Sequence, residues 1–147
     1  MKKILAVASG GGHWKQLMLL SPAFQNENVK YVTTLGGLPE QSNITNFSIV
    51  QDSNKSEKLK LLYTLIQVTW VFIGFRPDVI ITTGAAPGLL CLFLGKLFRK
   101  RTIWIDSIAN AEELSLCGKL SRMFSDKVLT QWESLACDAV EYKGAVF

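Results

Sequence analysis

A run of three glycines followed by the chain's only histidine is the strongest chemical signal in the sequence. Gly10, Gly11 and Gly12 follow Ser9 and precede His13. Because glycine has no side chain, a ligand can approach this backbone closely, and the free N–H groups of a following helix attract an anion. The spacing matches neither the dinucleotide fingerprint nor the P-loop. Two interpretations stay open: a tight turn between strand and helix, or a phosphate or diphosphate site that includes Ser9.

His13 stands at the mouth of this loop. Imidazole can take a proton from an attacking hydroxyl near neutral pH, so His13 is a candidate general base. It could equally contact a phosphate or serve a structural role. Position alone leaves these three roles open.

Two further loops carry polar or small residues after predicted strands. In the first, Thr83 and Gly84 are candidate ligand contacts, and the alternative is a well-made turn. In the second, Asp106 could act as a base or orient a sugar hydroxyl, with Ser107 as a further ligand contact. The alternative is that Asp106 and Ser107 cap the next helix, which both residue types do well.

The elements that must position these residues alternate along the chain. Continuous apolar runs are typical of parallel strands that are buried on both faces. The predicted strands cover residues 4–8, 29–34, 47–50, 79–83, 102–105, 127–130 and 140–142, with helices between most of them. This order predicts one α/β domain, residues 1–147, with a doubly wound, mostly parallel, Rossmann-like sheet. Such sheets bind ligands beyond the carboxyl ends of their strands, where all three loops are expected.

Residues 61–75 and 89–98 are strongly apolar and are predicted to be helices. The first carries no charge and would span roughly 22 Å, which is short of the ~30 Å hydrocarbon layer. It is apolar on nearly every face, whereas a helix that only covers a sheet needs one stripe. Both helices either cover the sheet or dock on a membrane or a partner. The predicted membrane contacts are Tyr63, Trp70, Phe72 and Phe75, with the basic cluster Arg99, Lys100 and Arg101.

The composition excludes several classes of protein. A hydrophobic fraction of 48% and a charged fraction of 19% favour a folded domain with its own core. A net charge of +4 is small for a nucleic-acid binder, so no nucleic acid is expected as a partner. Cys91, Cys117 and Cys137 form no CxxC pair, which argues against a disulfide framework or a zinc site. We interpret all three as small buried side chains, and we predict no metal and no cofactor.

A set of short motifs in a fixed order extends these local signals. They are SGGGH at residues 9–13, RPD at 76–78, TG at 83–84, PG at 87–88, DSIA at 106–109, LSLCGKL at 114–120 and QWE at 131–133. On these motifs the chain resembles the bacterial polysaccharide proteins of the PssD type and the eukaryotic asparagine-linked-glycosylation protein fourteen. The glycine loop with its histidine is also similar to that of the lipid-linked transferase MurG.

The resemblance implies the N-terminal lobe of a GT-B glycosyltransferase that works in capsule or exopolysaccharide synthesis. A separate PssE-like subunit would bind the nucleotide sugar and supply much of the catalysis. This chain would bind a polyprenyl-diphosphate-linked sugar acceptor at the cytoplasmic face of the membrane. His13 and Asp106 would be the catalytic candidates, although the family often has glutamate where Asp106 stands.

By the same resemblance, the partner subunit would dock on the C-terminal end of the chain. The predicted contacts are Gln131, Trp132, Glu133 and Tyr142. Eukaryotic members have an N-terminal membrane span, whereas this sequence shows none, so we expect peripheral attachment.

A chain of 147 residues provides only one of the two lobes that face each other in a GT-B enzyme, so we expect no activity from it alone. The alternative hypothesis is a small-molecule- or nucleotide-binding α/β module without catalysis. Its apolar helices would then mediate homodimerisation.

Overall fold

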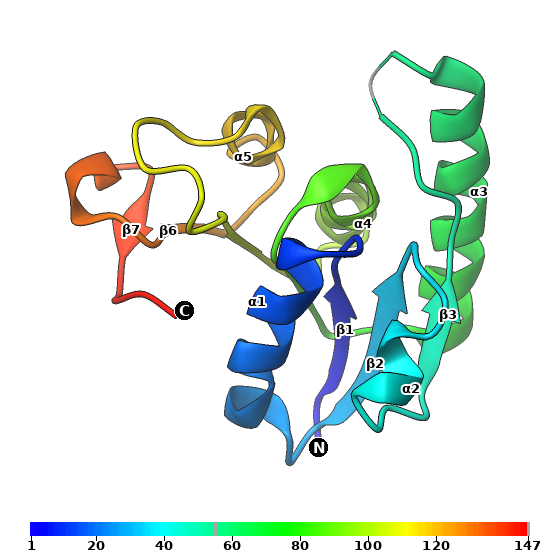
Figure 1. The fold of residues 1–147 in the computed structure, drawn as a ribbon. Helices are drawn as coiled ribbons and strands as arrows, with labels where there is room; N and C mark the ends of the chain where they lie inside the picture. Colours follow the sequence, from blue (N-terminus) through cyan, green and yellow to red (C-terminus); the bar gives the residue numbers. More distant parts are fainter. Residues whose placement is uncertain (55, 147) are drawn as a thin grey trace.

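Across residues 1–54 and 56–146, which the computed structural model describes, seven strands form one sheet in the order β3-β2-β1-β4-β5-β6-β7. Every strand is parallel to its neighbours (Figure 1). The strands are β1 (Lys3–Val7), β2 (Asn28–Thr33), β3 (Phe47–Ile49), β4 (Val79–Thr82), β5 (Arg101–Ile105), β6 (Lys127–Thr130) and β7 (Glu141–Tyr142). This sheet confirms the predicted doubly wound α/β fold, and only residues 55 and 147 of the predicted domain lie outside the description.

Helices connect the strands and cover both faces of the sheet. The α-helices are α1 (Gly12–Leu20), α2 (Leu38–Gln41), α3 (Lys58–Phe75), α4 (Ala85–Leu97) and α5 (Leu116–Ser121). Two 3-10 turns, η1 (Ser21–Phe24) and η2 (Glu133–Leu135), complete the chain. The helix predicted from residue 89 begins four residues earlier, because a proline in the first turn needs no N–H partner there.

The strand order reverses at the centre of the sheet, between β1 and β4. From β1 the chain continues to β2 and β3 on one side, and from β4 it continues to β5, β6 and β7 on the other. The loops that follow two such central strands diverge and leave a crevice at the carboxyl edge. The loop before α1 and the loop before α4 are these two loops (Figure 1).

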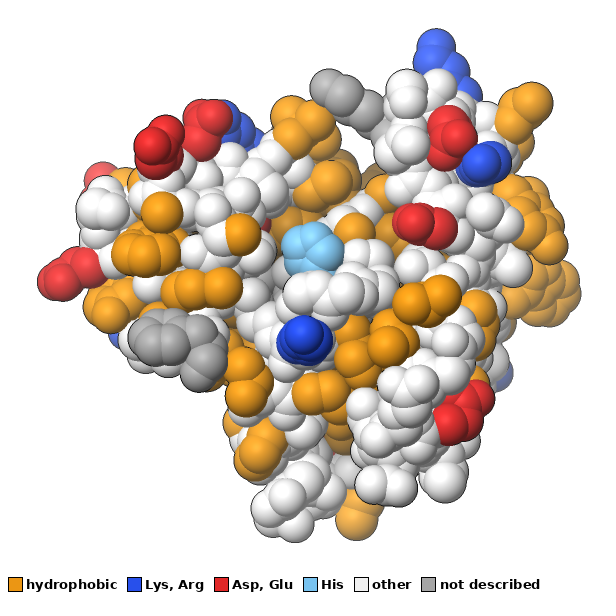
Figure 2. Space-filling model, viewed as in Figure 1, with side chains coloured by type: hydrophobic (Ala, Val, Ile, Leu, Met, Phe, Trp, Pro, Cys, Tyr) orange, Lys and Arg blue, Asp and Glu red, His pale blue; other side chains and the backbone are white. Residues whose placement is uncertain are grey.

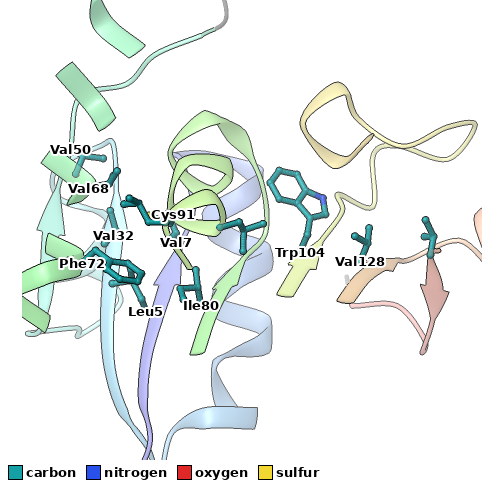
Figure 3. Packing of buried hydrophobic residues seen from close by; sticks show 13 residues of the cluster. Leu5, Val7, Val32, Val50, Val68, Phe72, Ile80, Cys91, Trp104 and Val128 are labelled. Atoms are coloured by element: carbon teal, nitrogen blue, oxygen red, sulfur yellow. The ribbon is translucent and has the colours of Figure 1, made fainter. Parts of the chain in front are cut away.

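The two sheet faces have separate cores because successive side chains of a strand point to opposite faces. Leu5 and Val7 of β1 pack with Val68 and other residues on the face that α3 and α4 cover (Figure 3). Ala6 belongs to the other core, together with Leu17 of α1. Burial on both faces explains why the strands read as continuous apolar runs.

The cysteines differ in environment. Cys91 is fully buried, and its burial raises the pKa of the thiol to about 12. Cys117 is half-buried and Cys137 is exposed. The prediction of three buried thiols is therefore wrong for Cys137, which lies in the short C-terminal segment after η2, away from the cores.

Candidate functional site

Two hydrogen bonds tie the loop after β1 to the loop after β4. His13 Nδ1 lies 3.0 Å from the carbonyl oxygen of Thr83, and Thr83 Oγ1 donates to the carbonyl oxygen of His13 at 2.7 Å. A carbonyl oxygen only accepts, so Nδ1 carries the hydrogen and the neutral ring keeps its lone pair on Nε2. The single histidine lies at the surface in the centre of the face in Figure 2. Its tautomer is the one that a general base at Nε2 requires.

Gly84 lies directly against the imidazole ring of His13. A Cβ built on Gly84 would lie 2.4 Å from Nδ1 and 2.5 Å from Cε1 of His13, so any side chain there would displace the ring. Gly84 has φ 143°, and Ala85 follows with φ 71°, a region that costs a non-glycine residue ~1–3 kcal/mol. The His13 ring therefore packs closely against Gly84, and the backbone of the next residue, Ala85, is strained.

Thr83 and Gly84 were predicted to contact a ligand, and the structure places both against His13. The two residues are buried, and the Thr83 hydroxyl is used on the His13 backbone. They are buried because they directly follow β4, a central strand with neighbours on both sides. Both residues are positioned to fix His13, and a direct ligand contact stays a prediction.

The glycine loop is open to solvent at its last two residues. A Cβ built on Gly11 or Gly12 would meet no described atom within 4 Å, whereas one on Gly10 would meet Leu35 at 3.3 Å. Gly11 needs glycine because its φ is 67°. Gly12 has no such φ, and Ser9 is half-buried just after β1. Nothing in the described protein thus demands glycine at residue 12, which favours the ligand interpretation of the loop.

The first turn of α1 carries unopposed N–H groups. Within the described residues no side chain caps this helix, and its first turn contains no acidic residue. The N-terminus of a helix attracts negative charge through these N–H groups and its dipole. The loop before α1 can therefore accept a phosphate or diphosphate.

Asp106 is buried, and its carboxylate is fully engaged. Trp104 Nε1 at 3.0 Å and Ser115 Oγ at 2.7 Å donate to Oδ1. Asn110 Nδ2 at 3.2 Å and the Ser115 N–H at 3.0 Å donate to Oδ2. With 1% exposure and four donors, this carboxylate folds the loop after β5 back on itself. The cap of the next helix, α5, is Ser115 rather than Asp106 or Ser107, and Asp106 holds that cap residue in place through both of its oxygens.

Buried glutamines anchor the same loop to its neighbours. Gln16 Nε2 and Gln131 Nε2 each donate to the carbonyl oxygen of Asp106 at 3.1 Å, and Gln16 Oε1 accepts from the Ile108 N–H at 3.3 Å. Gln131 is 5% exposed, so its predicted contact with a partner is wrong for its side chain. Gln16 was not predicted, although a polar residue on the apolar face of α1 was a visible signal.

The other C-terminal residues are accessible. Trp132, Glu133 and Tyr142 are exposed, and Trp132 Nε1 donates to the Ile108 carbonyl oxygen at 2.7 Å. Ser107 Oγ accepts from the Ala109 N–H at 3.2 Å, which makes a local turn. This end of the sheet offers two exposed aromatic side chains, of which Trp132 is held against the loop after β5.

Helix α3 packs on the sheet through one narrow stripe of Thr64, Val68 and Phe72. Phe72 is 3% exposed, and its ring centroid lies 5.3 Å from that of Phe98. Its predicted membrane contact is therefore wrong, because this side of the helix faces the core. Phe75 is half-buried, with the Lys3 ammonium 5.8 Å from its ring centroid.

The remaining surface of α3 is exposed and apolar, and we call it the apolar face of α3. Trp70 is 74% exposed on it. Its large side chains are Leu59, Leu62, Tyr63, Ile66, Trp70 and Ile73. An uninterrupted apolar surface of this kind marks an interaction site.

By length and composition α3 could cross a membrane, since it has 18 residues and only 17% of it is buried. The helix begins three residues before the apolar run at 61–75, and its 18 residues span roughly 27 Å, which remains slightly below the ~30 Å hydrocarbon layer. Its buried stripe and its packing against α4 hold it along the sheet.

Basic residues gather at the edge of the sheet opposite His13. Lys96, Arg99, Lys100 and Arg101 line a hollow of about 570 Å³ before β5, together with Asp126. A second, smaller hollow includes Lys100, Phe98 and Ile73 and joins this basic cluster to the C-terminal end of α3. Basic and apolar surfaces are thus contiguous.

With this geometry established, comparison with known proteins identifies the family. The family described as "Oligosaccharide biosynthesis protein Alg14 like" matches residues 40–146. The chain belongs to the Alg14-like family. This confirms the resemblance to asparagine-linked-glycosylation protein fourteen.

Named relatives of this Alg14-like chain are fungal. The UDP-N-acetylglucosamine transferase subunit alg14 of Schizosaccharomyces pombe is 26% identical over 176 aligned residues, which cover 99% of this chain and 81% of the relative. The ALG14 subunit of Candida albicans is 35% identical over 91 residues, or 56% of this chain and 42% of that protein. The first alignment includes the glycine loop, which precedes the part matched by the family.

Solved structures share the fold. MurG of Acinetobacter baumannii superposes with a TM-score of 0.80 at 11% identity, over 97% of this chain and 46% of that one. The UDP-GlcNAc 2-epimerase of Neisseria meningitidis superposes with a TM-score of 0.71 at 14% identity, over 95% of this chain and 45% of that one. The Alg14-like chain thus spans less than half the length of either, and the likeness confirms the predicted Rossmann-like lobe of the GT-B type.

Proposed function

We propose that this Alg14-like chain is the acceptor-binding subunit of a two-component glycosyltransferase and is inactive alone. Its relatives are named as subunits of a UDP-N-acetylglucosamine transferase, and the chain has the fold of about half of MurG. The observation that carries the proposal is the imidazole of His13, fixed by Thr83 and Gly84 beside an uncapped helix N-terminus. A partner chain would bind UDP-N-acetylglucosamine and close the cleft.

The acceptor in this proposal is a sugar on a polyprenyl diphosphate. The diphosphate would lie at Gly11 and Gly12, where the backbone is open and N–H groups are free of side-chain caps. The acceptor hydroxyl would face Nε2 of His13, which would remove its proton as the hydroxyl attacks the anomeric carbon and UDP leaves. Asp106 would act by folding the loop after β5, as a positioning residue rather than a base.

The partner would dock at the C-terminal end through Trp132, Glu133 and Tyr142, which are exposed there. Aromatic side chains of this kind are enriched at protein interfaces. The pathway in this proposal is the synthesis of a lipid-linked oligosaccharide repeat unit for a capsule or exopolysaccharide.

The chain would lie on the cytoplasmic face of the membrane with α3 parallel to the membrane plane. The apolar face of α3 has Lys58 and Lys60 at one end and the cluster Arg99, Lys100 and Arg101 at the other. Cations at both ends of an apolar surface fit a helix that rests among anionic headgroups. The triple change of this cluster to Glu should abolish binding to phosphatidylglycerol vesicles, and unchanged binding would contradict the proposed orientation.

Reconstitution tests the function. The chain, a candidate partner, radiolabelled UDP-N-acetylglucosamine and an undecaprenyl-diphosphate-linked sugar are combined, with each protein alone as a control. Transfer should require both proteins, and His13→Ala should lower kcat by about 10²–10⁴-fold while co-purification with the partner persists. Transfer by this chain alone would contradict the proposal. Tight UDP binding by the isolated chain, with no transfer alongside any partner, would favour the nucleotide-binding alternative.

A further inference from the structure

An apolar groove of about 420 Å³ lies between the first turns of α3 and α4 and helix α5. We call it the α3–α4–α5 groove. Side chains from all three helices line it, among them Leu61, Ala86, Leu89, Leu116 and Leu120, and Ser53 lies at its rim. The volume is within the range of about 300–1,000 Å³ that is typical of sites for small ligands.

The groove connects the two surfaces that the proposed function uses. Ala85 lines it and directly follows Gly84, on which the His13 ring rests. Leu61 lines it from α3, whose outer side is the apolar face. Figure 2 shows hydrophobic side chains in the hollow beside the histidine, between the α5 side and the start of α3. A molecule that enters from the apolar face of α3 would therefore reach the edge that carries His13.

The lining selects the chemistry of the occupant. The groove is lined by no charged side chain in the described part of the chain, and its two polar residues are Ser53 and Asn54. A sugar or nucleotide would lose its hydration there without gaining partners, so such ligands are disfavoured. An aliphatic chain loses no polar hydration there, and burial of its apolar surface favours binding.

One polar group at the rim lacks a partner. Ser53 is 8% exposed, and its hydroxyl has no hydrogen-bond partner among the described residues. Its oxygen is enclosed by the protein, so this hydroxyl does not alter the apolar surface that the groove presents to a ligand.

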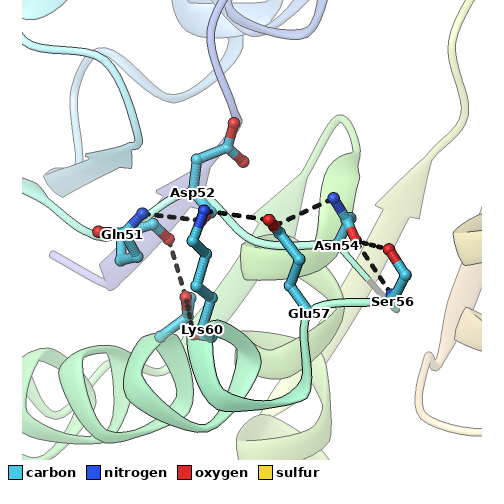
Figure 4. Close-up of polar contacts among 7 residues, drawn as sticks. Gln51, Asp52, Asn54, Ser56, Glu57 and Lys60 are labelled. Atoms are coloured by element: carbon cyan, nitrogen blue, oxygen red, sulfur yellow. Dashed lines mark hydrogen bonds and ion pairs between the residues drawn. The ribbon is translucent and has the colours of Figure 1, made fainter.

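The rim is fixed before any ligand arrives. Asn54 Nδ2 donates to Glu57 Oε2 at 3.1 Å, and Asn54 Oδ1 accepts from the Ser56 N–H at 3.0 Å (Figure 4). Thr64 Oγ1 donates to the Gln51 carbonyl oxygen at 2.8 Å. These bonds attach the segment before α3 to the helix itself. The groove is therefore formed without a ligand.

We propose that the α3–α4–α5 groove binds the isoprene units nearest the diphosphate of a polyprenyl-linked acceptor. The proposal rests on the proposed function and deepens it, because it places the start of the lipid tail inside the protein. The remainder of the tail would stay in the bilayer under the apolar face of α3. The diphosphate would then meet the glycine loop beside His13.

Equilibrium dialysis with tritiated farnesyl diphosphate, below its micellar concentration, tests the groove directly. The full chain should bind one equivalent, and Ala86→Phe, which fills the groove, should weaken binding by about 10-fold or more. Leu116→Glu is the second variant; Leu116 is 49% exposed, so a charge there should leave the fold intact and still weaken binding. The matched control is Leu97→Phe, at the 65% exposed far end of α4, which should bind like the natural chain.

The outcomes separate the groove from the proposed function. If both groove variants bind farnesyl diphosphate like the natural chain while the reconstituted pair stays active, the groove proposal is overturned and the proposed function stands. If binding depends on the groove but no partner or acceptor yields transfer, the proposed function fails and the groove stands. Competition by inorganic diphosphate that abolishes all binding, equally in every variant, would place the ligand on the glycine loop alone and overturn the proposal. So would variants that change only the oligomeric state in sedimentation.

Discussion

The imidazole of His13 lies so close to the Cα of Gly84 that a single methyl group on residue 84 would overlap it, at 2.4 Å from Nδ1. The same ring donates to the carbonyl oxygen of Thr83 at 3.0 Å. The His13 ring thus packs directly against the backbone of Gly84 and is oriented by the Thr83 carbonyl group. This contact lies where the strand order of the sheet reverses. The contact with the His13 ring explains why residue 84, with a φ of 143°, is a glycine.

Adding one methyl group at residue 84 should have a large effect on stability and activity. Gly84→Ala should lower the stability by about 1–3 kcal/mol, because alanine is strained at this φ, and should also push the imidazole out of place. Activity of the reconstituted pair should fall with it. Gly74→Ala is the control, since a Cβ there meets no described atom within 4 Å and alanine favours a helix. Thermal melts and transfer assays on both variants decide; a fully active Gly84→Ala would show that the ring position is unimportant.

Asp106→Asn separates structure from catalysis. The amide would place an NH₂ group against donors that now point at a carboxylate oxygen, so the free energy of unfolding should fall by about 2–5 kcal/mol. Urea denaturation measures this loss. A variant of natural stability that has lost only kcat would instead make Asp106 a direct participant in the reaction.

Two positions on α3 that are separated by one residue, Trp70 and Phe72, should respond in opposite ways. Trp70→Ser changes a 74% exposed side chain, so stability should change by less than about 0.5 kcal/mol while binding to anionic vesicles weakens. Phe72→Ser empties a core position and should cost about 3–5 kcal/mol. Vesicle sedimentation and urea denaturation are the two measurements. If Trp70→Ser sediments with vesicles like the natural chain, the apolar face of α3 serves another partner.

The thiols offer a direct check on the fold. At pH 8, N-ethylmaleimide should modify the exposed Cys137 readily and leave Cys91 unmodified in the folded chain. The thiolate is the reactive form, and with a pKa of about 12 the Cys91 thiol stays protonated at this pH. Raising the pH toward the pKa should increase the reactivity of Cys91 only as far as burial permits. Mass spectrometry of peptides gives the result, and early labelling of Cys91 would contradict its burial.

The sequence alone determined the elements and the edge where chemistry could occur. Its apolar runs marked the strands because strands buried on both faces need apolar side chains throughout, and the glycines before His13 marked the loop that opens onto solvent. Their order along the chain was enough to predict a doubly wound sheet with three loops at one edge. These features depend on residues that are close together in the sequence, so the pattern of residue types is enough to predict them.

Only the tertiary structure decided what each candidate residue does. Asp106 and Gln131 look available in the sequence, yet both are buried. The Asp106 carboxylate accepts from residues near it in the chain, and the Gln131 side chain donates to the Asp106 carbonyl oxygen and accepts from the Val146 N–H. Phe72 and Trp70 belong to one apolar helix, and no period in the sequence shows which of them faces the sheet. The role of Gly84 depends on a ring that is 71 positions earlier in the chain and reaches it across two adjacent strands. Contacts between distant segments depend on strand order and packing, which local residue patterns do not specify.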